Sequence, residues 1–429
     1  MQQLGSNRLR GLAPPNIVDW ARYLYPDERA EKFAFPGGYK PHSWRVLSAR
    51  LAGRKAFGIV VLGGATLMSA ACSSTASEST TQSVDRVSTT STAPDTSTST
   101  STVAAPARRA RLGAAVNAEL LVSDPAYAAL ISRHFDSVTA ENAMKWTVAR
   151  PTATTWDWTG ADAVVDFAQR EGLEVRGHTL VWGQPSGNGI PPWLNAMTDR
   201  DAFRGAVLDG IATQVGRYRG RVQRWDVVNE PLILVGGGLQ QNVFAQRMGS
   251  DYIELALRAT RSADPNVELW INENATEYLP AKADELVELV RGLKSRGVPL
   301  DGVGLQTHLT VDLPLPAGAI SDLVGRLRVL GVQVAVTEAD VPGGSPNRDA
   351  DAQVAMWKQV AQECVTSGCV ELTTWGVSDA HTWLDASGNR QNSPFLQAFP
   401  VPTRPLLFDE KLRAKPAFQA VEDVLTQGA

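Results

Sequence analysis

Eight short apolar runs rich in β-branched residues recur between residues 112 and 374, and segments with helical periodicity separate them. Strands that alternate with helices are typical of parallel βαβ units. Eight such repeats in about 250 residues suit an α/β fold of the closed (β/α)8 TIM-barrel type, with the helices outside. An open doubly wound sheet is the alternative, but no glycine-rich phosphate-binding turn follows the first run. The runs span 112–116, 134–138, 174–177, 223–228, 268–271, 302–305, 333–336 and 370–374.

Two of the intervening segments show the helical pattern most clearly. Apolar residues fall at positions i, i+3, i+4 and i+7 in 286–293 and again in 320–327. Gly297 and Gly331 follow these segments, and glycine is common just after the end of a helix. We therefore predict a helix before each of these glycines, within one domain over 107–429.

The charge of the chain argues against a nucleic-acid partner. Its 429 residues include 41 Lys and Arg against 45 Asp and Glu, so the formal net charge is −4. A protein built to neutralise nucleic-acid phosphates normally carries a basic stripe. The three cysteines are too few for a disulfide-stapled scaffold and lack the clustered spacing of a zinc site.

Residues 46–72 have the layout of a secretory signal. Three basic residues precede 56–71, which carries no charge and ends in small residues before Cys72. This apolar run is shorter than the about 20 residues that a membrane-spanning helix needs. The end of the segment also resembles a bacterial lipoprotein signal, which predicts a lipid on Cys72 and anchoring to a membrane. Simple cleavage and release is the alternative.

Two further segments flank this signal. Residues 1–45 show no clear periodicity, and because a signal should begin a protein, we interpret them as an extension produced by a start assigned too early. Residues 73–106 form a linker, since 20 of the 33 residues in 73–105 are Ser or Thr. Such a segment buries too little apolar surface to offset its backbone entropy, so we expect it to be disordered.

Polar and aromatic residues cluster directly after the predicted strands. In a parallel barrel the carboxyl ends of all strands line one pocket, so residues distant in sequence meet there. Regular placement of Trp, His and Glu after the strands therefore predicts a catalytic pocket. The residues are Glu141, Asn142, Lys145, His178, Trp182, Asn229, Glu230, Gln306, His308, Glu338, Asp340 and Trp375.

Two carboxylates stand out in this set. Glu230 ends the fourth run and Glu338 ends the seventh, 338 − 230 = 108 residues later. Strands four and seven can aim side chains across one mouth of a barrel. A glycosidic bond is cleaved by such a pair, in which one carboxyl group is protonated and the other is ionised.

Several ordered motifs resemble those of glycoside hydrolase family ten, whose usual member is an endo-1,4-β-xylanase. The resemblance extends from about Gly113 to Phe418. Each motif alone is modest, but their order makes the set specific. The motifs span 139–146, 177–182, 225–230, 304–308, 337–340, 374–377, 405–409 and 415–418.

The resemblance implies a retaining mechanism. Glu230 is then the general acid and later the base, and Glu338 is the nucleophile. Asn229 is expected to hydrogen-bond the sugar 2-hydroxyl group, and His308 with Asp340 to form a network beside Glu338. The alternatives for His308 and Asp340 are a structural histidine and a strand-end cap.

The same resemblance assigns substrate-binding residues to both sides of the pair. Glu141, Asn142 and Lys145 are expected to bind sugars on the non-reducing side of the cleaved bond. We expect a monomer that acts on a polysaccharide without a metal or organic cofactor, because two carboxylates suffice. The residues expected to shape the site for the sugar being cleaved are His178, Trp182, Gln306, Trp375 and Trp383.

The sequence departs from the family pattern at three places. Gly183 stands where the family usually has a second His, and Gln184 to Ile190 forms an altered loop. Residues 272–275 read Asn-Glu-Asn-Ala instead of Asn-Asp-Tyr-Asn, so Asn274 replaces an aromatic platform on the leaving-group side. Hydrolysis of internal β-1,4-xylosidic bonds of xylan remains the implied function. The alternatives are the same chemistry on another glycan, such as an arabinose-containing envelope polymer or an aryl glycoside, and a non-catalytic glycan-binding wall protein.

Cys364 and Cys369 lie close together in the sequence, just before the eighth run. Gly368 between them allows a tight turn. In an exported protein, tethered to the cell envelope or secreted, such a pair is expected to form a disulfide. A pair of free buried thiols is the alternative.

Overall fold

The computed structural model describes residues 108–184, 189–234, 237–343, 350–392, 394–397, 399 and 401–427. The predicted segments 1–45, 46–72 and 73–106, together with Cys72, lie outside the described residues. Within the described ranges, no helix is both long enough and apolar enough to span a membrane.

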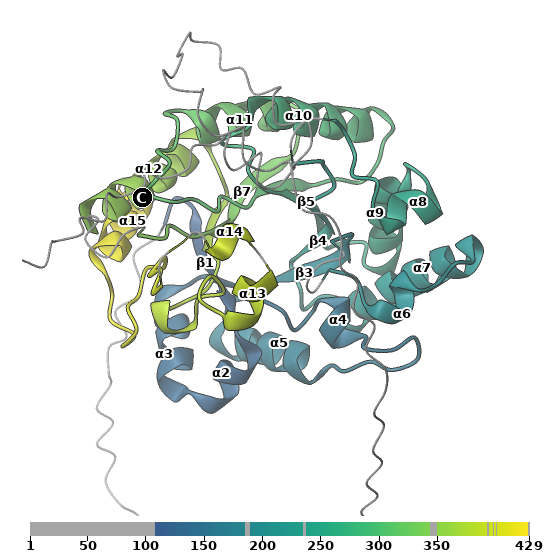
Figure 1. Cartoon of the computed structure of the whole chain (residues 1–429), viewed down its shortest axis with the longest axis horizontal. Helices are drawn as coiled ribbons and strands as arrows, with labels where there is room; N and C mark the ends of the chain where they lie inside the picture. Colours follow the sequence, from purple (N-terminus) through teal and green to yellow (C-terminus); the bar gives the residue numbers. More distant parts are fainter. Residues whose placement is uncertain are drawn as a thin grey trace, which may run out of the picture. The chain divides into compact units, whose positions relative to one another are not determined.

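Eight parallel strands close into a barrel, and strands that follow one another in the sequence are neighbours in the sheet (Figure 1). The last strand pairs with the first, which closes the ring. This confirms the predicted TIM barrel and excludes the open sheet. The strands are β1 (Arg111–Val116), β2 (Ser137–Ala140), β3 (Glu174–Trp182), β4 (Arg224–Asn229), β5 (Glu268–Glu273), β6 (Gly302–Leu305), β7 (Gln333–Ala339) and β8 (Glu371–Thr374).

Helices connect successive strands and surround the barrel, as Figure 1 shows. They are α2 (Ala118–Ser123), α3 (Pro125–His134), α4 (Trp146–Ala149), α5 (Thr159–Glu171), α6 (Pro192–Asn195), α7 (Arg200–Arg217), α8 (Val243–Met248), α9 (Tyr252–Ala263), α10 (Pro280–Ser295), α11 (Ala319–Arg328), α12 (Ala350–Ser367), the 3-10 helix η2 (Asp379–His381), α13 (Ser387–Asn392), α14 (Pro394–Gln397) and α15 (Pro416–Thr426).

Local sequence explains where these helices begin and end. Asn117, Asp124 and Asp199 accept backbone N–H groups from the first turns of α2, α3 and α7, which leaves fewer of those donors without a partner. Gly297 and Gly331 follow α10 and α11 with φ values of 65° and 75°, a region that glycine enters without a steric penalty. Both predicted helix ends are therefore confirmed.

The second strand begins later than the sequence predicts. The run 134–138 begins inside α3, because His134 is the last residue of that helix and its ring lies 5.3 Å from the ring of Phe408. Phe135 caps the helix and is buried. These residues pack at the helix end rather than in the sheet, so β2 begins at Ser137.

Glycines on neighbouring strands make room for two large aromatic side chains of the sheet. Trp225 and Trp270 are completely buried. A Cβ atom at Gly177 would lie 2.2 Å from Trp225, and one at Gly302 would lie 2.2 Å from Trp270. Since such contacts are too close for any side chain, glycine is required at both positions.

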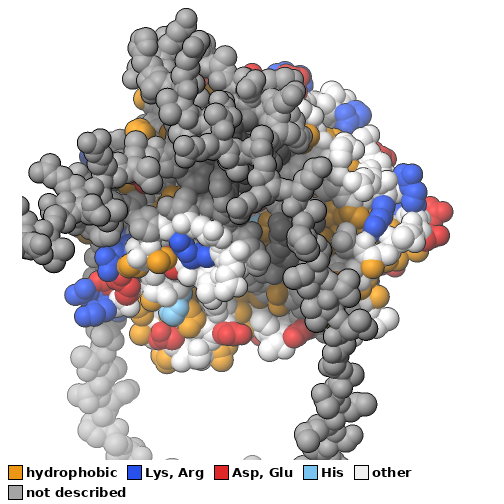
Figure 2. All heavy atoms as spheres, in the orientation of Figure 1, with side chains coloured by type: hydrophobic (Ala, Val, Ile, Leu, Met, Phe, Trp, Pro, Cys, Tyr) orange, Lys and Arg blue, Asp and Glu red, His pale blue; other side chains and the backbone are white. Residues whose placement is uncertain are grey.

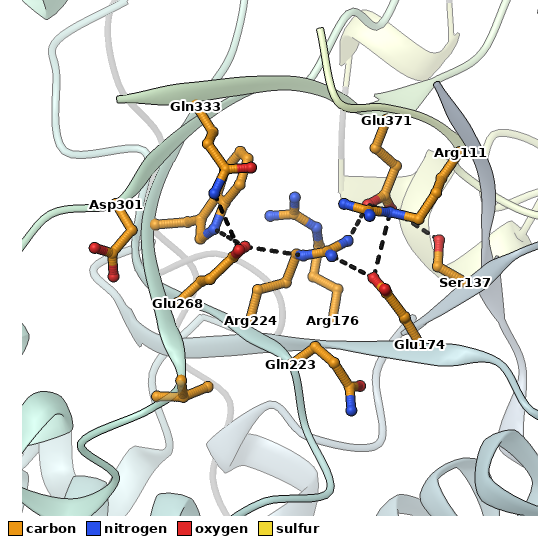
Figure 3. Close-up of polar contacts among 12 residues, drawn as sticks. Arg111, Ser137, Glu174, Arg176, Gln223, Arg224, Glu268, Asp301, Gln333 and Glu371 are labelled. Carbon is orange, nitrogen blue, oxygen red and sulfur yellow. Dashed lines mark hydrogen bonds and ion pairs between the residues drawn. The ribbon is translucent and has the colours of Figure 1, made fainter. Parts of the chain in front are cut away.

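A network of charged side chains, centred on the buried Arg224 and Glu371, lies at the end of the barrel where the strands begin (Figure 3). Arg224 forms ion pairs with Glu371, Glu174 and Glu268, which begin β8, β3 and β5. Ser137 donates a hydrogen bond of 2.9 Å to Glu371. Burial alone would raise the pKa of Glu371, but the nearby arginines, Arg224 foremost, lower it to about 2. The network therefore joins the first residues of several strands at the end opposite the predicted pocket.

The structure corrects the prediction of a disulfide between Cys364 and Cys369. Both cysteines are buried and free. The N–H group of Cys369 donates to the carbonyl oxygen of Cys364 at 2.9 Å, across a turn in which Gly368 has a φ of 87°. Sγ of Cys364 lies 3.6 Å from the carbonyl oxygen of Glu371. Backbone hydrogen bonds and burial thus close this turn without a covalent link.

The described surface mixes both signs of charge. On the face drawn in Figure 2, acidic and basic side chains of the described residues are interspersed, with apolar side chains between them. This distribution matches a formal net charge close to zero.

Candidate active site

The predicted site residues come together beyond the carboxyl ends of the strands. His178 and Trp182 belong to β3, and the remaining residues lie at the last positions of their strands or in the loops that follow. Trp383 comes from the loop after η2. In a parallel barrel these positions face one mouth.

Glu230 follows β4 and is held at both carboxylate oxygens. Nε2 of Gln306 donates to Oε1 at 3.0 Å, and Nε1 of Trp182 donates to Oε2 at 3.0 Å. Glu230 is half-buried and has a φ of 53°, a left-handed conformation that is uncommon for a residue with a side chain. Its carboxyl group is thus oriented by one donor from β3 and one from the loop after β6.

Glu338 lies near the end of β7 and is only 4% exposed. Nδ2 of Asn272 donates to Oε1 at 2.5 Å, and Nε2 of His308 lies 3.3 Å from Oε2. Each oxygen of this buried carboxylate therefore faces a nitrogen donor.

A continuous chain of side-chain hydrogen bonds connects the two carboxylates. Gln306, which holds Glu230, also lies 3.4 Å from Oδ1 of Asn229 through Nε2. Nδ2 of Asn272 donates to the same Oδ1 at 2.8 Å and, as described, to Glu338. The structure therefore brings the two predicted carboxylates into one site. Sequence reasoning did not assign Asn272, although its position at the end of β5 was a signal.

His308 is bound by acidic groups on both sides. Nδ1 lies 3.0 Å from Oδ2 of Asp340, and Nε1 of Trp383 donates to that oxygen at 2.7 Å. Burial opposes the charged form of His308, but Asp340 and Glu338 outweigh it and raise the pKa well above its usual value. The two carboxylates therefore favour the charged form of His308, the form in which both ring nitrogens can donate.

A second histidine is fixed from inside the barrel. Nδ1 of His178 lies 3.0 Å from Oδ2 of Asp226, whose other oxygen accepts from Arg176 at 2.7 Å. Burial alone would raise the pKa of Asp226, but Arg176 and His178 lower it. The ring of His178 meets that of Trp375 edge-on at 5.0 Å. Asp226 and Arg176 were missed from sequence because they lie within apolar strands.

Lys145, Asn142 and Glu141 form a third group. Nζ of Lys145 donates to Oδ1 of Asn142 at 2.9 Å, and Nδ2 of Asn142 donates to Oε1 of Glu141 at 3.1 Å. The Lys145 ammonium also lies over the rings of Trp182 and Trp375, at 5.1 and 5.7 Å. Burial lowers the pKa of Lys145 and raises that of Glu141. The group supplies donors and acceptors beside two aromatic faces, which suits a sugar.

Among the described residues, no group of three or more His, Cys, Asp or Glu side chains is placed to hold a metal ion.

Comparison with known families identifies this arrangement. The family described as "Glycosyl hydrolase family 10" matches residues 100–424. The chain belongs to glycosyl hydrolase family 10. It is a glycoside hydrolase of the endo-1,4-β-xylanase type, and family 10 retains the configuration of the cleaved sugar.

Individual family 10 proteins are similar over most of the barrel. Endo-1,4-β-xylanase 3 of Hypocrea jecorina is 34% identical, over 70% of this chain and 78% of its own length. The endo-1,4-β-xylanase of Agaricus bisporus is 35% identical, over 68% of this chain and 84% of its own.

Solved family 10 structures agree with the fold. Xylanase 10B of Thermotoga maritima has a TM-score of 0.66 at 30% identity, over 74% of this chain and 95% of its own. A variant of xylanase 10C of Cellvibrio japonicus, in complex with xylopentaose, has a TM-score of 0.67 at 30% identity, over 75% of this chain and 68% of its own.

The structure accounts for the family 10 departure at Gly183. A Cβ atom there would lie 2.4 Å from Cγ and Nδ2 of Asn242. Asn242 also caps α8 by accepting the N–H group of Ala245 at 3.0 Å. The side chain of Asn242 thus occupies the space beside residue 183, and a histidine does not fit there. In the altered loop, residues 185–188 lie outside the described ranges.

Asn274 does not provide the aromatic platform that the family usually has at this position. Its Oδ1 accepts a hydrogen bond of 2.7 Å from Nζ of Lys282, which is almost completely buried in α10. The amide oxygen is therefore turned toward the protein interior, and the family's usual stacking surface is absent from this position.

Proposed function

We propose that the chain cleaves internal β-1,4-xylosidic bonds of xylan by double displacement, with Glu230 as acid and base and Glu338 as nucleophile. The observation that carries this proposal is the chain of hydrogen bonds through Gln306, Asn229 and Asn272, which links two differently held carboxyl groups. Retaining glycosidases need such a pair at one bound sugar.

In the first step, an oxygen of Glu338 attacks the anomeric carbon and the bond to the leaving oxygen breaks. Glu230 transfers its proton to that oxygen, so the shortened xylan chain departs as an alcohol. In the second step, Glu230 takes a proton from water, which attacks the anomeric carbon and releases Glu338. Two inversions leave the configuration of the sugar unchanged.

The surrounding residues suit a sugar chain on the non-reducing side. Lys145, Asn142 and Glu141 provide hydrogen-bonding groups for sugar hydroxyls, and Trp375 and Trp383 provide apolar surfaces. Asn229 is placed to bind the 2-hydroxyl group, a contact that strengthens in the transition state. The chemistry requires no metal or organic cofactor, and we propose that the enzyme acts as a monomer.

A second candidate is the same reaction on another glycan, such as an arabinose-containing envelope polymer or an aryl glycoside. The inward direction of Asn274 and the glycine at position 183 favour it, because both remove groups that usually contact substrate. A glycan-binding protein without activity is disfavoured, because Glu230 and Glu338 are both present.

Release of reducing sugar from a panel of polysaccharides tests these alternatives. We expect xylan to be cleaved to oligosaccharides, and Glu338→Ala to abolish release. Cleavage of an arabinan in preference to xylan would replace the first candidate by the second. Binding without release of sugar from any polymer would contradict both.

We also propose that the protein is exported and tethered by a lipid on Cys72, with 73–106 as a disordered linker to the catalytic domain at 107–429. The apolar run before Cys72 and the Ser/Thr-rich composition support this layout. Mass spectrometry of the mature N-terminus tests it. A diacylglyceryl Cys72 at the N-terminus supports tethering, an unmodified N-terminus shows secretion, and a peptide from 1–45 contradicts the proposed start.

A further inference from the structure

The carboxylate of Glu273 stands at the end of β5 and belongs to the segment that departs from the family pattern. It is completely buried, and both oxygens are bound. Oε1 accepts from Nζ of Lys282 at 2.8 Å and from the N–H group of Asn274 at 3.0 Å. Oε2 accepts from the N–H group of Leu232 at 2.9 Å. The last contact connects the end of β5 to the loop after β4.

Leu232 is two residues beyond Glu230, and the turn between them is held from β5. The N–H group of Glu230 donates to the carbonyl oxygen of Asn272 at 2.8 Å. Pro231 has no N–H group to donate. Leu232 therefore supplies the next donor of the turn, and that donor binds Glu273.

This turn needs outside support. Glu230 has a φ of 53°, and a non-glycine residue keeps such a conformation only where surrounding contacts fix it. The backbone of Asn272 and the side chain of Glu273 provide these contacts on the β5 side. The position of the Glu230 carboxyl group therefore depends on where Glu273 is held.

Glu273 in turn is fixed by Lys282 and Asn274. Lys282 is 1% exposed and divides its hydrogen bonds between Oε1 of Glu273 and Oδ1 of Asn274, at 2.8 and 2.7 Å. A buried charge without its partner is strongly unfavourable, so the two charged groups constrain each other. The replacements at 273 and 274 thus form one unit around Lys282, which explains why Asn274 points inward.

We propose that Glu273 is a positioning residue that, held by Lys282 and Asn274, fixes the Glu230–Leu232 turn and aims the Glu230 carboxyl group at the leaving oxygen. This inference rests on the proposed role of Glu230 as the acid. Proton transfer requires hydrogen-bond distance to the leaving oxygen, and misplacement by about 1 Å can lower a rate about 100-fold.

Glu273→Gln tests the inference. The amide has one acceptor oxygen, so its NH2 group must face either the N–H of Leu232 or the donors Lys282 and Asn274. Rates are measured on aryl β-xylobiosides whose leaving groups differ in basicity. Help from an acid matters most when the leaving oxygen is basic. We expect the rate to fall about tenfold or more for the most basic leaving groups and to change little for the least basic ones. The rate should therefore depend more steeply on leaving-group basicity than it does in the wild type.

Three variants make the result decisive. Glu371→Gln alters an equally buried, ion-paired carboxylate at the opposite end of the barrel, and we expect the same fractional change for all leaving groups. Asn274→Ala removes only one partner of Lys282, so it tests the inference even if Glu273→Gln does not fold. We expect the same selective loss of rate on substrates with basic leaving groups, but a smaller one. Glu230→Ala should show the steepest dependence of rate on leaving-group basicity.

The outcomes separate the two proposals. A selective loss in Glu273→Gln or Asn274→Ala, absent in Glu371→Gln, supports the positioning role. A uniform loss across leaving groups in the variants at 273 and 274 would overturn it. A uniform loss in Glu230→Ala would instead overturn the role of Glu230 as acid.

Discussion

Nδ2 of Asn272 donates a hydrogen bond of 2.5 Å to Oε1 of Glu338. The same nitrogen donates to Asn229, so one amide orients both the proposed nucleophile and the residue beside the proposed acid. Side-chain amides that orient charged groups in a site with little water contribute substantially to rate.

Replacement of Asn272 by Ala should therefore lower kcat about 10- to 100-fold, with a small change in KM, because the lost contacts orient reacting groups. Steady-state kinetics on an aryl β-xylobioside measure this. A change in KM alone, at unchanged kcat, would show that Asn272 serves only to bind substrate.

The pair His308 and Asp340 predicts a pH-dependent contribution to stability. The folded-state pKa of His308 lies well above its usual 6.5, with burial opposing the shift and Asp340 the main cause of it. A raised pKa stabilises the folded protein fully below pH 6.5, and this contribution is lost as the pH rises through the folded-state pKa. Asp340→Asn should weaken the effect, so its unfolding free energy should fall less steeply above pH 6.5. Parallel curves for the variant and the wild type would exclude this coupling.

The ion pairs of Glu371 predict the opposite dependence. Its folded-state pKa of about 2 lies below the usual 4.5, so the group stabilises the protein above pH 4.5 and this contribution is lost as the pH falls toward 2. Glu371→Gln leaves Arg224 with fewer partners and should cost about 3–5 kcal/mol at neutral pH. Denaturant unfolding between pH 3 and 7 measures both effects. A variant as stable as the wild type at pH 7 would show that the network contributes nothing net.

Contact between Gly183 and Asn242 predicts a compensating pair of changes. Gly183→Ala should destabilise the fold by about 1–3 kcal/mol, because its Cβ would meet the Asn242 side chain. Asn242→Gly alone should cost only a few tenths of a kcal/mol, since glycine is tolerated at the start of a helix. The double variant should recover most of the loss. Additive effects in this cycle would show that the two positions do not compete for space.

The sequence predicted the barrel because strands buried on both faces appear as continuous apolar runs, and 302–305 and 333–336 lie within strands. It located Glu230 and Glu338 because strand ends in a barrel share one mouth. The strand predicted at 134–138 began too early, because an apolar helix end such as that of α3 resembles the start of a strand.

Contacts between distant residues were not predictable in this way. Asp226 and Asn272 act through partners on other strands, and nothing in their neighbours indicates those partners. The coupling of Glu273 to Lys282 and Leu232 likewise appears only when β4, β5 and α10 are packed together. The disulfide prediction relied on spacing and compartment, whereas burial and backbone hydrogen bonds already close the turn between Cys364 and Cys369.

Covalent trapping of the nucleophile tests the central claim most directly. A 2-deoxy-2-fluoro xylobioside with a good leaving group slows the second step, so the glycosyl-enzyme accumulates and intact-protein mass followed by peptide mapping locates it. We predict one fluoro-xylobiosyl group per chain, on Glu338, and its slow loss in water. A label on another residue, or turnover without a label and with inverted product configuration, would contradict the account.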